Sequence, residues 1–270
     1  EVATPFESAK YKLGGSADRA SMDGGIYTGL YESGSSLSLI PIDYGDPSLV
    51  GYWTFNEGTG SVANDASGHG KNGTLSCDGS GCTNPSWVGG KVGSNSLYFN
   101  PATSSQRSYV TAASINNSAV SGSVISISLW ANPDATQING GWFIRNGTGA
   151  DENYGFNFGT PSGGNYGVAI TGYYDGAFRS GTTAGYFIPA SVWSHIVLVF
   201  VQGQTMQVYL NGTFQQTVNY PYINGVSVSS FNIGGHGGTS QAFNGFIDDV
   251  RIYSRALTTS EILALYNATK

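Results

Sequence analysis

The sequence is poor in charged residues, in sulfur and in long apolar segments. Charged residues make up 10% of its 270 residues, and there are only two cysteines, two methionines and three histidines. A typical soluble domain is about 25% charged. No apolar run reaches the length of about 18 residues that a membrane-spanning helix needs. The 17 acidic residues outnumber the 11 basic ones and give a net charge of −6. This balance argues against nucleic acid as a partner and is compatible with divalent cations.

What is abundant is glycine, with 40 residues, and aromatic side chains, which make up 13% of the chain. This aromatic and apolar content is too high for a disordered chain. Together with many Ser, Thr and Asn residues, it is typical of an extracellular β-sandwich with many turns. The chain starts at Glu1 without a visible signal peptide, so we expect a processed or truncated product whose lost segment carried an export signal or an anchor.

Short alternating segments separated by turn residues fill residues 49–270. Residues 124–131 alternate clearly between apolar and polar side chains, and residues 193–201 form the most apolar segment, which predicts an interior strand. Residues 206–218 contain Asn211-Gly212 between two strand patterns, which predicts a hairpin with a type I′ turn. Many short strands of this kind predict an all-β sandwich or jelly roll.

The C-terminal residues 243–266 predict a strand that closes the sandwich and then a short helix. Thr258 and Glu261 form a capping box just before an apolar segment, which marks the start of the helix. By period-2 alternation, one face of the strand is expected to carry Phe246, Asp248, Val250 and Ile252.

Over residues 49–270 the chain resembles the laminin-G-like, concanavalin A-like jelly-roll domains of bacterial surface proteins. The motifs that carry the resemblance are GYWTFNEGTGSVANDASGHGKNGTL at 51–75, ISISLWANP at 125–133, WSHIVLVFVQGQTMQVYLNG at 193–212 and FNGFIDDVRIYSRALTTSEILALY at 243–266. The resemblance implies a two-sheet jelly-roll sandwich with one short C-terminal helix. It also implies binding to glycans or to cell-surface proteins, sometimes with calcium.

Residues 1–48 differ from the rest and are rich in glycine and serine. They resemble the end of type IV pilin-like or pseudopilin-like proteins, through FESAKYKLGGSADRASMDGG at 6–25 and LYESGSSLSLIP at 30–41. This implies a module displayed on a surface-anchored protein, or one that self-associates into a filament. The alternative is an ordinary Gly/Ser-rich segment that leads into the domain.

Cys77 and Cys82 are separated by glycines and a few polar residues, a spacing that can close a small disulfide loop. A disulfide implies an oxidising compartment, and therefore an extracellular or cell-surface protein. Two free thiols are the alternative, whereas a zinc site lacks histidine partners at ligand spacing.

Oxygen-bearing side chains suggest three places for calcium. Asp65 lies in a glycine-rich turn, Asp248 is expected to face the core, and Asp151 and Asn153 lie in an acidic loop. Calcium needs six to eight oxygen ligands, and each place has a simpler interpretation. Asp65 would accept backbone N–H groups of its own turn, Asp248 would be a buried hydrogen-bond centre joining the last strand to the first, and the acidic loop would be a solvated turn.

Aromatic residues in two predicted loops are candidates for ligand binding. Their rings would stack on the apolar faces of sugars, while neighbouring polar groups bind the hydroxyls. The alternative is packing over the edges of the sandwich. These residues are Tyr173, Tyr174, Phe178, Tyr220 and Tyr222.

The sequence carries no local signal for catalysis. The fold also occurs in glycoside hydrolases, where acidic residues two apart on a strand are an economical way to bring two carboxyl groups together. In this chain no glutamate has an aspartate two residues further on. We therefore expect a non-enzymatic, extracellular adhesion module. The alternatives are a structural pilus or surface-layer subunit and an accessory module of a glycoside hydrolase.

Overall fold

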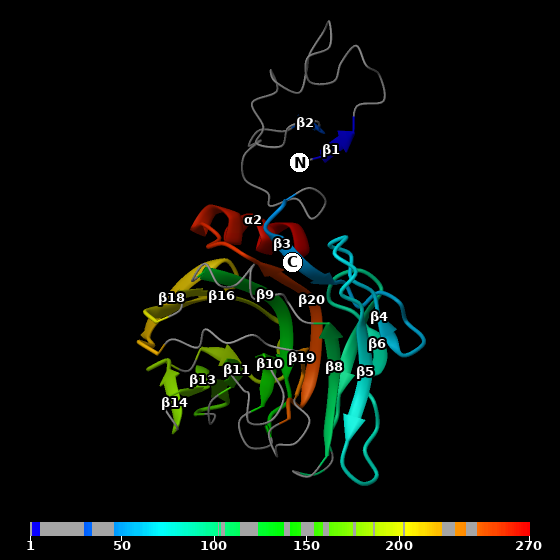
Figure 1. Ribbon diagram of the computed structural model, residues 1–270, viewed down its shortest axis with the longest axis vertical. Helices are drawn as coiled ribbons and strands as arrows, with labels where there is room; N and C mark the ends of the chain where they lie inside the picture. The colour runs from blue at the N-terminus through cyan, green and yellow to red at the C-terminus, as the bar shows by residue number, and fades with distance from the viewer. Residues whose placement is uncertain are drawn as a thin grey trace, which may run out of the picture.

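The computed structural model describes residues 2–5, 30–33, 46–101, 103, 106–113, 124–137, 141–146, 154–158, 162–174, 177–185, 187–201, 203–222, 230–235 and 242–270. Two eight-stranded antiparallel sheets stack face to face, and a C-terminal helix lies across the outer face of one of them (Figure 1). The predicted all-β, two-sheet jelly-roll sandwich with one short C-terminal helix is confirmed. No helix in these residues is long and apolar enough to cross a membrane.

We call the sheet beneath the helix the helix-side sheet. Its strand order is β18-β17-β16-β9-β20-β7-β6, with β3 paired to β20. The strands are β3 (Leu49–Trp53), β6 (Ser86–Gly89), β7 (Asn95–Phe99), β9 (Val124–Pro133), β16 (Ser194–Val201), β17 (Thr205–Leu210), β18 (Thr213–Asn219) and β20 (Gly245–Tyr253).

We call the other sheet the far sheet, and its order is β14-β13-β11-β10-β19-β8-β5-β4. Its strands are β4 (Val62–Ala63), β5 (Gly73–Asp78), β8 (Arg107–Ala113), β10 (Trp142–Asn146), β11 (Tyr154–Phe158), β13 (Val168–Tyr174), β14 (Ala177–Thr182) and β19 (Ser230–Ile233). Two short pairs complete the strands: β1 (Val2–Pro5) with β2 (Leu30–Ser33), and β12 (Asn165–Tyr166) with β15 (Ile188–Pro189).

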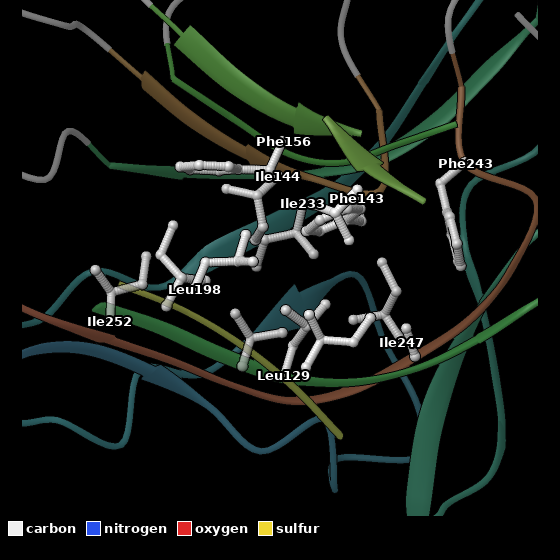
Figure 2. Packing of buried hydrophobic residues seen from close by; sticks show 14 of the residues in the cluster. Leu129, Phe143, Ile144, Phe156, Leu198, Ile233, Phe243, Ile247 and Ile252 are labelled. Carbon is white, nitrogen blue, oxygen red and sulfur yellow. The ribbon is translucent and has the colours of Figure 1, made fainter. Parts of the chain in front are cut away.

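The main core fills the space between the two sheets. Strand β9 contributes the alternating side chains Ile125, Ile127 and Leu129, while polar residues between them face outward. Ile144 and Ile233 of the far sheet face them across the interior (Figure 2). The period-2 pattern of the sequence therefore assigns one side of each strand to the core.

The predicted hairpin and interior strand are both confirmed. Asn211 and Gly212 have φ angles of 49° and 77°, as a type I′ turn requires. The Asn211 side chain also accepts a hydrogen bond of 2.9 Å from the backbone N–H of His195. Strand β16 pairs with β17 on one side and with β9 on the other.

The expected alternation of the last strand is wrong because β20 contains a bulge. Its register with β9 shifts between Asp248 and Arg251, and Asp249 has a φ of 52°. The bulge reverses the side on which side chains point. The core-facing residues are therefore Ile247, Val250 and Ile252 (Figure 2). The prediction is correct for Val250 and Ile252, beyond the bulge, and wrong for Phe246 and Asp248, before it.

Helix α2 (Thr259–Thr269) begins at the predicted capping box. The Thr258 side chain accepts from the Glu261 N–H, and the Glu261 carboxylate accepts from the Thr258 N–H at 2.7 Å. The helix buries Ile262 and Leu265 in a second apolar cluster, together with Leu257 of the segment between β20 and α2. The other members belong to the helix-side sheet and point away from the main core: Leu49, Tyr52, Val197, Val199, Tyr209 and Tyr253. The amphipathic C-terminal segment thus covers one end of the sandwich's outer face.

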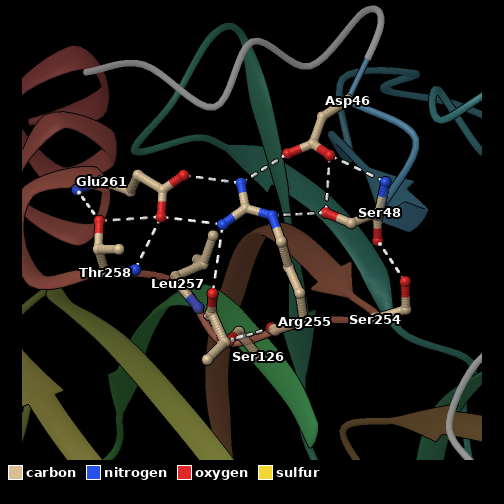
Figure 3. Close-up of polar contacts among 9 residues, drawn as sticks. Asp46, Ser48, Ser126, Ser254, Arg255, Leu257, Thr258 and Glu261 are labelled. Atoms are coloured by element: carbon tan, nitrogen blue, oxygen red, sulfur yellow. Dashed lines mark hydrogen bonds and ion pairs between the residues drawn. The ribbon is translucent and has the colours of Figure 1, made fainter. Parts of the chain in front are cut away.

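An ion-pair cluster fastens the start of the domain to this helix (Figure 3). Arg255 binds the carboxylates of Asp46 and Glu261 at 2.9 and 2.7 Å. The Ser254 N–H donates to the Ser48 carbonyl at 2.7 Å, next to the pairing of β3 with β20. The division of the chain into residues 1–48 and 49–270, and the pilin-like resemblance, remain predictions, because most of residues 1–45 lie outside the described residues.

Candidate functional site

The predicted disulfide is confirmed. Cys77 lies in strand β5 and bonds to Cys82 in the turn that follows. The Gln106 side chain donates to the Ser80 carbonyl at 2.9 Å, within the closed loop. The bond stabilises a turn at one end of the sandwich.

Asp65 organises its own turn with both carboxylate oxygens. Oδ1 accepts the N–H groups of Tyr52 and Ser67 at 3.0 and 2.9 Å, and Oδ2 accepts the N–H of Lys71 at 2.8 Å. Burial raises the pKa of Asp65, but hydrogen bonds from the Ser67 side chain and from the backbone of Lys71, Tyr52 and Ser67 outweigh it and hold the pKa below its usual value. The geometry matches the hydrogen-bonding interpretation of this residue.

Asp248 is fully buried and fixes the loop between β6 and β7. Its Oδ2 accepts the N–H groups of Lys91 and Val92, both at 2.8 Å. Burial raises the pKa of Asp248 to about 7, although these two donors oppose that shift. Asp248 is thus a hydrogen-bond centre, but it joins the last strand to residues 91–92 and not to the first strand of the domain.

The contact with the first strand is made instead by the neighbouring Asp249, which the alternation of the sequence places on the outward face. The Tyr52 hydroxyl of β3 donates to Asp249 at 2.9 Å, and Arg251 pairs with the same carboxylate at 3.2 Å. The Arg251 guanidinium also lies over the Tyr52 ring. Buried charges need partners, and the bulge in β20 brings these three groups together.

Residues Asp151 and Asn153, proposed for calcium, lie outside the described residues. Within the described ranges, no three His, Cys, Asp or Glu side chains converge in a geometry that could hold a metal ion. Calcium binding by this chain therefore remains a prediction.

The predicted aromatic loops differ from expectation in two ways. Tyr173 and Tyr174 end strand β13, and Phe178 lies in β14, where Tyr173 is the register partner of Phe178. This segment is therefore a pair of strands and not a loop. The expected exposure of Tyr220 is wrong, because the ring is fully buried in the main core. Tyr222 is half-buried at the rim of that core.

The two aromatic segments, far apart in sequence, meet where the edges of the two sheets approach each other. The Tyr220 hydroxyl donates to the Arg179 carbonyl of β14 at 3.4 Å. The Arg179 guanidinium lies 5.6 Å from the centre of the Tyr222 ring, and the Tyr220 and Tyr222 rings stand edge to face at 5.1 Å. We call Arg179, Tyr220 and Tyr222 the sheet-edge cluster. It combines the cation of Arg179, the half-buried ring of Tyr222 and the fully buried ring of Tyr220.

A second group, of one aromatic and three polar side chains, lies on the outer face of the far sheet. Trp142 packs where a Cβ on Gly155 would sit, and the Arg145 guanidinium lies 4.5 Å from the centre of the Trp142 ring. Burial lowers the pKa of Arg145 to about 10. Along the same cross-strand row, Thr111 donates to Asn232 at 2.9 Å. Trp142 and Arg145 are each only 3% exposed. We therefore assign this group a structural role and not a ligand-binding one.

Comparisons with solved structures agree on the fold. Domain 4 of AbnA, an extracellular GH43 arabinanase from Geobacillus stearothermophilus solved with arabinotriose, has 22% identity and a TM-score of 0.60, covering 81% of this chain and 98% of that one. The binding domain of Paraclostridial Mosquitocidal Protein 1 has 19% identity and a TM-score of 0.57, covering 82% of this chain and 52% of that one.

The binding domain of botulinum neurotoxin DC, solved in complex with rat synaptotagmin II, has 16% identity and a TM-score of 0.58, covering 83% of this chain and 52% of that one. The chain thus spans about half the length of the two toxin domains. A comparison with curated protein sequences finds no match.

The family comparison extends over more than half of the chain. Residues 104–263 match the family described as the Concanavalin A-like lectin/glucanases superfamily. These residues run from strand β8 into helix α2, and so include strands of both sheets. The chain belongs to the concanavalin A-like lectin/glucanase superfamily.

Proposed function

We propose that this protein is an extracellular, non-enzymatic module that binds glycans. The observation that carries the proposal is the convergence of Arg179 and Tyr222 at the sheet-edge cluster. A half-buried ring beside a guanidinium offers an apolar surface for the C–H face of a sugar and a donor for its hydroxyl groups. Tyr173 and Phe178 lie on the two strands that bring Arg179 to this edge.

The solved relatives support this class of function. One neighbour in fold is a domain of an arabinanase bound to arabinotriose. Others are receptor-binding domains of botulinum neurotoxins, and the cell entry of botulinum neurotoxin type C depends on interaction with two ganglioside molecules. The disulfide between Cys77 and Cys82 supports an oxidising, extracellular environment. Adhesion on a surface-anchored, pilin-like protein is the biological setting that we propose.

Calcium is a further part of the proposal. Asp151 and Asn153 would supply oxygen ligands from one loop, and additional oxygens would have to come from neighbouring groups or water. Asp65 is a weaker candidate, because backbone N–H groups already occupy both of its oxygens.

A glycan-array screen in calcium and in chelator tests the proposal. We expect a glycan hit, about tenfold weaker in Tyr222→Ala. Phe214→Ala is the matched control, because Phe214 is a 46% exposed ring that packs against Tyr209, at the opposite end of strand β18 from Tyr220. A hit lost in chelator would support calcium near Asp151. No binding by the unaltered protein in either condition would contradict the proposal and favour a structural surface-layer or pilus subunit.

A further inference from the structure

Helix α2 covers only part of the outer face of the helix-side sheet. Its last turn lies over Trp130, whose indole N–H donates to the Thr269 hydroxyl at 2.9 Å. Beneath it, His195 lies 5.3 Å from the Trp130 ring and 6.0 Å from the Tyr266 ring, and it bonds Ser128 at 2.9 Å. The same sheet face continues past Trp130 and His195 through the next outward-facing residues of β9 and β20 and through Trp193.

Those next residues form a row of aromatic rings contributed by three separate segments. Phe246 of β20 is the register partner of both Tyr98 of β7 and Asn132 of β9. The Tyr98 and Phe246 rings are 4.5 Å apart, and the Trp193 ring is 6.0 Å from Phe246 on its other side. All three rings are only half-buried, and the adjacent Val192 is 50% exposed. We call Tyr98, Phe246 and Trp193 the aromatic row.

Hydrogen-bonding groups border this row. The Tyr98 hydroxyl donates to the Asp134 carboxylate at 3.3 Å. The Asn132 Oδ1 is buried, and within the part of the chain that the structure describes it accepts no hydrogen bond. The Asn132 side chain as a whole is half-buried, so a ligand hydroxyl would reach Oδ1 once the amide turns outward, and that bond would remove the cost of an unpaired buried acceptor.

We propose that the aromatic row, with Asn132 and Asp134, is a second carbohydrate-binding surface, which takes a neutral polysaccharide laid across the three rings. Apolar rings fit the C–H faces of successive sugars, while an amide and a carboxylate match their hydroxyl groups. The surface shares its ligand class with the proposed function, and thus rests on it, but it shares none of its residues with the sheet-edge cluster.

Charge favours a neutral ligand over an acidic one. The whole chain carries a net charge of −6, and Asp134 adds a carboxylate at the border of the row. The nearby cation, Lys91, is held over the Trp130 ring, with Nζ 4.7 Å from its centre. An acidic polysaccharide would therefore meet repulsion, which none of the described side chains of the row offsets with a positive charge.

Affinity electrophoresis of the whole chain tests the proposal, in gels that contain linear arabinan, β-glucan or polygalacturonate. We expect retardation by at least one of the two neutral polymers and none by polygalacturonate. Trp193→Ala and Phe246→Ala should weaken the neutral interaction about tenfold. Trp193→Phe should restore most of it, because a ring is kept. Thermal melting of each variant verifies that it is folded.

The sheet-edge variant Tyr222→Ala separates this surface from the proposed function. Binding that is lost in Tyr222→Ala but unchanged in folded Trp193→Ala and Phe246→Ala would overturn the second surface and leave the proposed function standing. No binding of any polymer by the unaltered protein would overturn both. Concentration-dependent dimerisation that Trp193→Ala abolishes, measured by light scattering, would overturn the carbohydrate assignment in favour of a contact between two copies.

Discussion

The guanidinium of Arg255 lies 2.9 Å from the carboxylate of Asp46, although 209 residues separate them along the chain. The same guanidinium also donates two hydrogen bonds to Glu261, at 2.7 and 2.9 Å. Arg255 therefore joins the start of the domain to the first turn of helix α2 (Figure 3). A guanidinium suits this position because its planar fork can donate to two carboxylates at once.

Replacement of Arg255 by alanine is expected to destabilise the protein by about 1–2 kcal/mol, because Asp46 and Glu261 lose a shared charged donor. Urea denaturation at pH 7 measures the change. Arg255→Lys keeps the charge but not the fork, and it should recover less than half of the loss. If Arg255→Ala were as stable as the unaltered protein, the ion pairs of Arg255 would contribute nothing to stability.

The effect of Arg255→Ala should also depend on pH. Burial raises the pKa values of Asp46 and Glu261, but hydrogen bonds from Ser48, Thr258 and Arg255 outweigh it and lower both. A carboxyl whose folded pKa is depressed contributes stability above its unfolded pKa, and that stability disappears as pH falls through the folded value. The difference in the free energy of unfolding between the unaltered protein and Arg255→Ala should therefore be largest near pH 7 and should shrink below about pH 4.

Asp248→Asn is expected to stabilise the protein at alkaline pH. The folded pKa of Asp248 is raised to about 7, so between roughly pH 4 and 7 the folded state binds more protons than the unfolded state, and stability falls as pH rises. Asparagine keeps an acceptor for the N–H groups of Lys91 and Val92 without a charge. We expect a gain of order 1–2 kcal/mol at pH 8 and little gain at pH 5, measured by denaturation at both pH values. An equal gain at both would contradict the ionisation argument.

Gly212→Ala is expected to destabilise the protein by about 2 kcal/mol. Gly212 has a φ of 77°, and a Cβ there would lie 2.9 Å from Leu263 Cδ1 and 3.3 Å from the Leu263 Cα of helix α2. Gly68→Ala is the matched control, since Gly68 has a φ of 85° and no atom within 4 Å of an added Cβ. Thermal melting should show a larger loss for Gly212→Ala, and equal losses would mean that the contact with α2 is unimportant.

Reduction of the Cys77–Cys82 disulfide is expected to cost about 2 kcal/mol, because the bond closes a short loop and restricts the unfolded chain. The double variant Cys77→Ser, Cys82→Ser should show the same loss without a reductant. Denaturation with and without dithiothreitol measures both. A reductant that also destabilises the double variant would point to an effect outside this bond.

Local patterns were enough to predict several elements of the fold. The alternation in residues 124–131, the Asn211-Gly212 turn and the Thr258–Glu261 capping box each depend on neighbours within a few residues. The structure shows all three as predicted. The disulfide is equally local, because Cys77 and Cys82 are five residues apart.

The candidate sites could not be predicted in the same way, because they depend on contacts between distant segments. The burial of Tyr220 follows from the packing of two sheets, and its contact with Arg179 spans 41 residues. The bulge at Asp249 reverses the faces of β20, and it is maintained by Tyr52, 197 residues away.

Neighbouring residues alone were sufficient to predict short strands, tight turns and a capped final helix, because hydrophobic alternation and turn chemistry act over short distances along the chain. Which side chains remain accessible depends instead on packing between distant segments. Tyr98, Phe246 and Trp193 come together because β7 and β20 pair in one register and Trp193 precedes the neighbouring strand β16. Strand register and helix docking are set by the packing of the whole sandwich, and no local pattern encodes them.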